Sequence, residues 1–93
     1  MAAATVRRDG EALVFDGALL RTECAALWRQ ASALAAGARR FELGAVEAVD
    51  SAGLALLAEL AERCGGVRVH GAPPGLSELR AAYRLDEALA FAS

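Results

Sequence analysis

The sequence predicts a single α/β domain of the order β-β-α-β-α-β-α, with a mixed sheet of about four strands and the helices mainly on one face. Two strand-like runs flank Asp9-Gly10, and a D-G pair between such runs is a strong hairpin signal. After this hairpin, segments with helical spacing of apolar residues alternate with short strand-like runs, which is typical of parallel strands joined by helices. The chain has 93 residues, so residues 1–93 are expected to form one small domain.

Apolar periodicity and turn residues give the element boundaries. Apolar residues recur at helical spacing from Leu20 to Ala36, and Gly37 is the expected end of that helix. Gly65-Gly66 ends a second helix, and the second proline of Pro73-Pro74 suits the first turn of a third. The predicted strands span residues 4–8, 11–16, 39–43 and 67–70. The predicted helices span residues 20–36, residues 50–64 and a stretch from Pro74, with a loop at 44–49 and a short helical segment at 86–91.

Composition excludes several classes of protein. The formal net charge is −2 and the pI is about 5.3, so the chain has no basic field that could hold a nucleic-acid backbone. No apolar run reaches the roughly 18 residues that a membrane span needs, and the first residues lack the pattern of a secretory signal. We therefore expect a cytoplasmic protein with no nucleic-acid partner and no direct membrane insertion.

The sequence contains no motif of catalysis or of cofactor binding. It lacks a phosphate-binding loop, a dinucleotide-binding glycine pattern and a nucleophile elbow. His70 is the only histidine, and Cys24 and Cys64 lie far apart in the chain, so the ligands for a metal site are too few. We expect two reduced thiols, no metal, no cofactor and no enzymatic activity.

The stretch from Asp50 to Leu54 reads D-S-A-G-L and holds the most informative residues. Ser51 stands where a loop turns into a helix, so its hydroxyl is a candidate N-cap. The same position suits a phosphate group, because the free N–H groups and the helix dipole favour anions. Gly53 leaves the backbone uncovered one turn later, which lets a partner approach closely. The alternative is purely structural: Ser51 only caps the helix and Gly53 only packs.

The second helix is more apolar than the burial of one face requires. Its charged residues, Glu59, Glu62 and Arg63, mark the solvent-facing arc at about 100° per residue. Leu56 lies on the flank of that arc, and Ala55 faces outward. Beside the helix start, these two side chains indicate a contact surface.

The D-S-x-G-L signature, the element order and the chain length together resemble the STAS domain. That family includes bacterial anti-sigma-factor antagonists and the STAS domains of transport systems. The longer stretch from Val49 to Leu57 is most similar to MlaB, the small cytoplasmic STAS subunit of the Mla phospholipid ABC transporter. The stretch Ala26-Leu27-Trp28 is also similar to the corresponding MlaB helix.

This resemblance implies docking on an ABC transporter ATPase subunit, MlaF-like and in complex with a permease. Docking would support the assembly and activity of a transporter that moves phospholipid between two membranes and serves outer-membrane lipid asymmetry. The chain would then lie at the inner membrane through its partner. Ser51 would hydrogen-bond the ATPase, Gly53 would allow close approach, and Leu56 would supply apolar burial. The expected partner-binding residues are Asp50, Ser51, Gly53, Ala55 and Leu56.

The antagonist branch of the family gives an alternative function. In its members a serine kinase phosphorylates the serine that matches Ser51, and the added charge can abolish docking. That branch usually carries an acid in a G-x-L-D pattern after the second strand, where Gly17 to Leu20 here reads G-A-L-L. This departure, together with Ala55 and Leu56, favours the transporter branch. A third possibility is a STAS protein of another signalling assembly, such as a stressosome-like complex or a small-ligand sensor.

Overall fold

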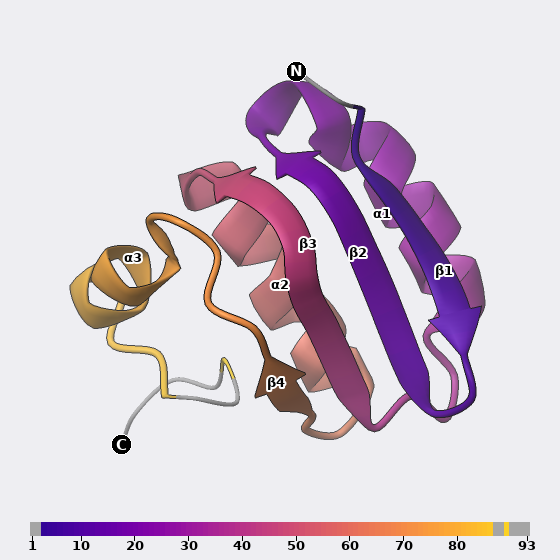
Figure 1. The fold of residues 1–93 in the computed structure, drawn as a ribbon. Coiled ribbons are helices and arrows are strands. Elements are labelled where there is room, and N and C mark those ends of the chain that lie inside the picture. Colours follow the sequence, from indigo (N-terminus) through magenta and orange to yellow (C-terminus); the bar gives the residue numbers. More distant parts are fainter. Residues whose placement is uncertain (1–2, 87–88, 90–93) are drawn as a thin grey trace.

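A computed structural model describes residues 3–86 and Leu89 of the chain. The elements follow the predicted order β-β-α-β-α-β-α (Figure 1). The strands are β1 (Thr5–Asp9), β2 (Ala12–Leu19), β3 (Arg40–Val49) and β4 (Arg68–His70). The helices are α1 (Arg21–Leu34), α2 (Ser51–Arg63) and α3 (Leu76–Ala82).

The four strands form one mixed sheet in the order β1-β2-β3-β4. A two-residue turn joins β1 to β2, which pair antiparallel with Asp9 opposite Ala12. Gly10 in this turn has a φ of 59°, a left-handed conformation that glycine adopts without strain. β2 pairs parallel with β3, and β3 pairs parallel with β4. The predicted hairpin and the predicted parallel arrangement after it are therefore confirmed.

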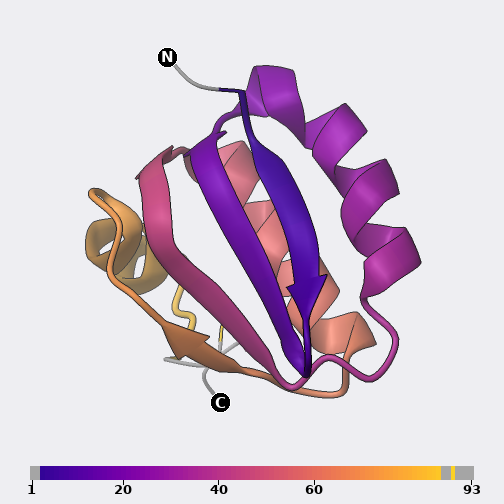
Figure 2. The same ribbon diagram turned by 45° about the vertical axis from the view of Figure 1, so that its right-hand side comes forward.

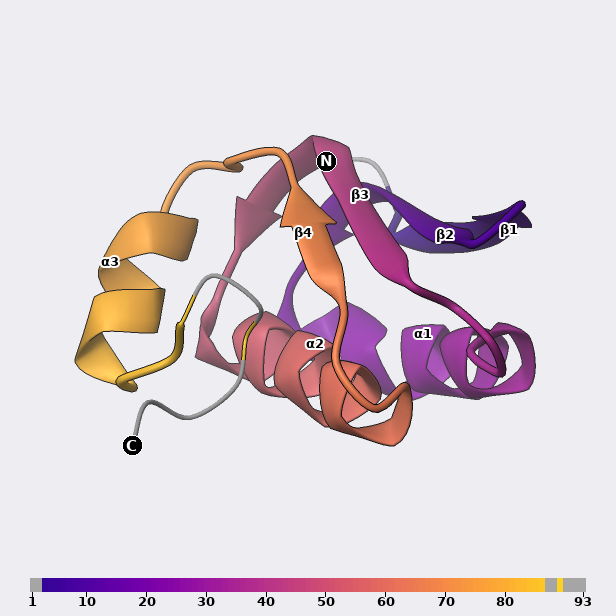
Figure 3. The ribbon, with the colours of Figure 1, turned by 90° about the horizontal axis from the view of Figure 1, so that it is seen from below.

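The helices lie mainly on one face of the sheet, as predicted. α1 and α2 lie side by side beneath the sheet, and α3 lies next to α2 at the end where β3 and β4 form the edge (Figures 2 and 3). The core fills the space between the sheet and these helices. At its centre the rings of Phe15 and Phe41 meet edge to face with centroids 5.4 Å apart, a favourable aromatic geometry.

β3 is twice as long as predicted, and the expected loop at residues 44–49 is wrong. This stretch continues the strand and keeps pairing with β2 until Val49 lies opposite Leu19. Two register shifts, between Val14 and Asp16 and between Gly17 and Ala18, accommodate extra residues of β3. The bulges disturb the alternation of buried and exposed residues, so the sequence pattern does not read as a strand.

The ends of two helices differ from the prediction. α1 stops at Leu34. The Arg8 guanidinium donates to the carbonyl oxygen of this last residue and to that of Ala36, two residues further along the chain. α3 begins at Leu76 rather than at Pro74, because Pro74 lies in the turn that precedes the helix. Most of the predicted segment at residues 86–91 lies outside the described residues.

Candidate functional site

α1 and α2 begin at the same edge of the sheet, because each follows one of two neighbouring parallel strands. Asp50, between β3 and α2, joins the two helix starts. Its Oδ1 accepts a hydrogen bond from the N–H of Gly53 at 2.8 Å, and its Oδ2 accepts one from the N–H of Arg21 at 2.9 Å. Asp50 is therefore the N-cap of α2 and also satisfies the first N–H of α1. The prediction that Ser51 caps the helix is wrong.

The ionised form of Asp50 is stabilised in the folded protein. Burial raises the pKa of this carboxyl, but hydrogen bonds from the N–H groups of Gly53, Arg21 and Ala52, together with the Arg21 charge, lower it. The net result is a pKa below the ordinary value of 3.8. Because both carboxylate oxygens accept bonds from the chain's own backbone, Asp50 acts chiefly inside the fold.

Gly53 is buried, so the expectation of an uncovered backbone at this position is wrong. A Cβ added to Gly53 would lie 2.0 Å from the carbonyl oxygen of Leu19 and 3.0 Å from the Leu19 Cβ. The first turn of α2 thus rests directly on the end of β2, where only a hydrogen atom fits. Gly53 therefore packs α2 against the sheet, and its contact with a partner stays a prediction.

Leu56 is also buried: its side chain belongs to the core and only 6% of the residue is exposed. The expectation that Leu56 is exposed on the flank of α2 is therefore wrong, whereas its contact with a partner stays a prediction. Arg63, two turns further along the same side of α2, lies over the Trp28 ring of α1 with its Cζ 4.9 Å from the ring centroid. Leu56 accordingly faces α1. The positions of the charged residues of α2 predict that this flank is exposed, but α1 covers it.

Ser51 and Ala55 are exposed on the other side of α2. They line an open, mostly apolar groove between α2 and the end of α3, which we call the α2–α3 groove. Its volume is about 310 Å³. Tyr83 forms part of the far wall and is 50% exposed, the one large exposed hydrophobic residue among those that the structure describes. The lining residues are Arg21, Ser51, Ala52, Leu54, Ala55, Ala58, Tyr83 and Leu85.

A comparison with protein families identifies the fold that carries this groove. The family model described as "Mlab, STAS domain" matches residues 4–90 of the chain. The chain belongs to the STAS domain family. The resemblance to MlaB is confirmed by the same match. No curated protein matches the chain significantly.

In this STAS domain another residue compensates for the acid that the G-x-L-D pattern would place at Leu20. Leu20 is the N-cap residue of α1, and its side chain makes no capping bond. The Asp50 carboxylate, reaching across from β3, supplies the acceptor for the N–H of Arg21 instead. One carboxylate therefore serves two helix starts in this chain.

Sequence reasoning missed the far wall of the groove. Tyr83, the C-cap residue of α3, is half exposed on this wall, and Leu85 lies on it two residues further along the chain. The signal available in the sequence was the single tyrosine directly after a short helix, but only the packing of α3 beside α2 brings it opposite Ala55.

Elsewhere in the described part of the chain, the structure holds no group of three or more His, Cys, Asp or Glu residues that could bind a metal. None of its described helices is long and apolar enough to cross a membrane. Cys24 and Cys64 are free and only partly buried. His70 lies on the sheet, where its Nδ1 is 3.2 Å from Oε1 of Glu42.

Proposed function

We propose that this STAS domain is a non-catalytic subunit that docks, through Ser51 and the α2–α3 groove, on the ATPase of a phospholipid-transport ABC complex. The partner ATPase is MlaF-like and works with a permease, and docking supports the assembly and activity of the transporter. The domain would then reside in the cytoplasm, held at the inner membrane by its partner. One observation carries the proposal: Ser51 and Ala55 remain exposed beside an apolar groove, while Asp50 performs the capping.

The physical character of the groove supports a protein partner. Exposed aromatic side chains are enriched at protein interfaces, and Tyr83 stands half exposed on the groove wall. Three alanines, Ala52, Ala55 and Ala58, line the α2 side and let another chain approach closely. The Ser51 hydroxyl at the rim can donate and accept hydrogen bonds with that chain. A docked face of this kind typically buries about 800 Å² on each partner.

The exposed Ser51 hydroxyl also fits the second candidate function, an anti-sigma-factor antagonist switched by phosphorylation. A serine kinase would reach this hydroxyl at the start of α2, and a phosphate would bring roughly −1.5 to −2 charges to the rim of the groove. The match to the MlaB-like model and the absence of an acid at Leu20 favour the transporter.

We expect Ser51→Glu to weaken docking at least tenfold, about 1.4 kcal/mol, because a charged side chain must be desolvated at the rim. The test is affinity purification of the tagged chain from its native cells. Mass spectrometry then identifies the partners and determines whether Ser51 is phosphorylated. Ser77→Glu is the matched control, because Ser77 is exposed on α3 and does not line the groove.

The expected result is an ABC ATPase and a permease with the wild-type chain and with Ser77→Glu, much less of both with Ser51→Glu, and an unmodified Ser51. Recovery of a serine kinase with phosphate on Ser51 would establish the antagonist instead. Equal recovery of the ATPase by the wild-type and Ser51→Glu chains would contradict the role of Ser51.

A further inference from the structure

We infer that the partner segment that docks in the α2–α3 groove is acidic: it carries an apolar anchor with carboxylates on both sides of it. This inference rests on the proposed function for the place of docking, and it adds the chemistry of the partner. Two sets of groups support it, namely the apolar lining of the groove and two arginines beside it.

The groove fits an apolar anchor. Its lining is mostly apolar, and Leu54, Ala55, Tyr83 and Leu85 are among the residues that form it. Its volume of about 310 Å³ is large enough to admit a large apolar side chain. Burying such a side chain contributes on the order of 1.5–3 kcal/mol, so an aliphatic or aromatic anchor is favoured over a polar one.

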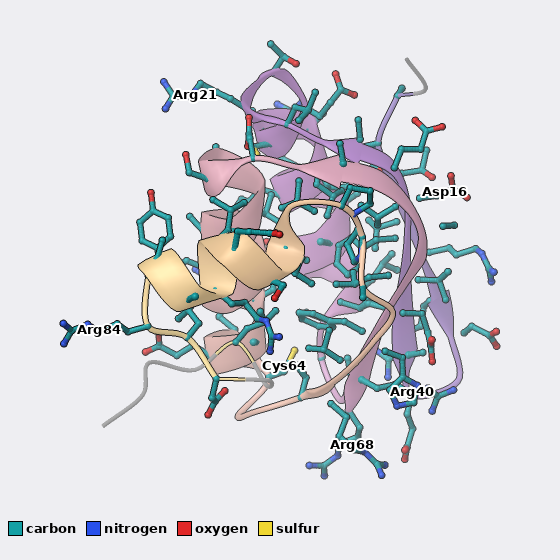
Figure 4. All side chains as sticks on the ribbon, turned by 60° about the vertical axis from the view of Figure 1, so that its left-hand side comes forward. Asp16, Arg21, Arg40, Cys64, Arg68 and Arg84 are labelled. Atoms are coloured by element: carbon teal, nitrogen blue, oxygen red, sulfur yellow. The ribbon has the colours of Figure 1, made fainter. Side chains whose placement is uncertain are left out.

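The two arginines stand at different parts of the groove. Arg21, at the start of α1, lines it together with Ser51. Arg84 lies between the two lining residues Tyr83 and Leu85, and the φ of 56° at Arg84 turns the chain sharply after α3. Both residues are exposed, and both side chains point to solvent on the same side of the molecule (Figure 4).

Neither guanidinium forms an ion pair within the described part of the chain. The neighbouring acids are already engaged: Asp50 accepts backbone hydrogen bonds from Arg21 and Gly53, and Asp86 has an interaction of its own. Glu59 and Glu62 do not line the groove, but each follows a lining alanine, Ala55 or Ala58, by one turn of α2. Arg21 and Arg84 thus offer cationic groups to a docked chain, and the Asp50 carboxylate offsets part of the Arg21 charge.

Arginine beside an apolar groove selects carboxylates. Its planar guanidinium forms paired, charge-assisted hydrogen bonds with them, and like charges brought together during docking are strongly disfavoured. Because Arg21 lines the groove and Arg84 lies in the chain between its lining residues Tyr83 and Leu85, an apolar anchor between two acidic positions would bring a carboxylate toward each. A segment with basic flanks would instead meet two unpaired cations.

Photo-cross-linking from the groove wall tests this inference. Tyr83 is replaced by p-benzoyl-phenylalanine, which keeps an aromatic ring at a half-exposed position. The native cells are irradiated, and the cross-linked partner peptide is sequenced by mass spectrometry. We expect an apolar residue with Asp or Glu within roughly one helical turn on each side. The charge-reversal variant Arg21→Glu/Arg84→Glu should lower the cross-link yield at least tenfold.

The matched control is Arg39→Glu/Arg68→Glu, which makes the same change of charge at exposed positions that do not line the groove. Its yield should equal that of the parent. A cross-linked peptide with neutral or basic flanks, or an undiminished yield after reversal at Arg21 and Arg84, overturns the inference.

The same experiment separates this inference from the proposed function. A cross-linked ATPase peptide without acidic flanks supports the proposed function and contradicts the inference. An acidic peptide from a protein that is not an ABC ATPase supports the inference and contradicts the function. The absence of any cross-linked peptide contradicts both.

Discussion

Gly53→Ala is expected to destabilise the domain by about 3 kcal/mol, at the upper end of overpacking effects. The added methyl group would lie 2.0 Å from the Leu19 carbonyl oxygen, and this neighbour is backbone of β2 rather than a movable side-chain end. Relief requires α2 to shift away from the sheet, which opens the core that Leu54 and Leu57 fill from the same helix. Urea unfolding measures the change.

Gly44→Ala is the control for this prediction. Gly44 lies in β3, and a Cβ added there meets no atom within 4 Å. The same chemical change should therefore be close to neutral, or stabilising by about 0.4–1 kcal/mol through the unfolded chain. Equal stabilities for the Gly53→Ala and Gly44→Ala variants would contradict the close packing of α2 on β2.

Asp50→Ala is expected to cost about 2 kcal/mol of unfolding free energy. One capping side chain is worth about 1 kcal/mol, and this carboxylate serves the first turns of both α1 and α2. Asp50→Asn should retain about half of that stability, because its one amide oxygen can cap one helix, whereas its NH2 group cannot accept from the N–H of the other. Thermal or urea unfolding of the two variants compares them. Equal losses from Ala and Asn would show that the capping geometry is unimportant.

The same carboxylate gives the stability a dependence on pH. Its pKa is lower in the folded than in the unfolded state, so its contribution is fully present above the unfolded value of about 3.9. The contribution is lost as the pH falls below that value and through the folded pKa. We expect a smaller loss of unfolding free energy over this acid range in Asp50→Asn than in the wild-type chain.

The fold was largely predictable from the sequence because its main signals are local. Asp9-Gly10 marked the hairpin, and the glycines after α1 and α2 marked the ends of those helices. The second half of β3 was not predictable in this way. Its two register shifts depend on pairing with β2, which the local sequence does not contain. Gly44 and Ala45 are also both exposed within the strand, so the sequence pattern there is typical of a loop.

The sequence predicted only those features of the site that depend on a single helix. The exposure of Ala55 follows from the periodicity of α2, which the sequence contains. The burial of Gly53 and Leu56 depends on β2 and α1, which the periodicity of one helix does not include. The motif therefore has two kinds of residue: Asp50, Gly53 and Leu56 hold the fold, whereas Ser51 and Ala55 face the groove.

This division is tested most directly by the affinity of the Ala55→Gln variant for the ATPase recovered with the wild-type chain. Glutamine is a good helix former, so the unfolding free energy should change by no more than about 0.5 kcal/mol. Its amide would occupy the α2–α3 groove, and we expect the affinity, measured by calorimetric titration, to fall at least tenfold. Ala33→Gln, at an exposed position of α1 outside the groove, should bind as the wild type does. An unchanged affinity for Ala55→Gln would contradict docking through this face.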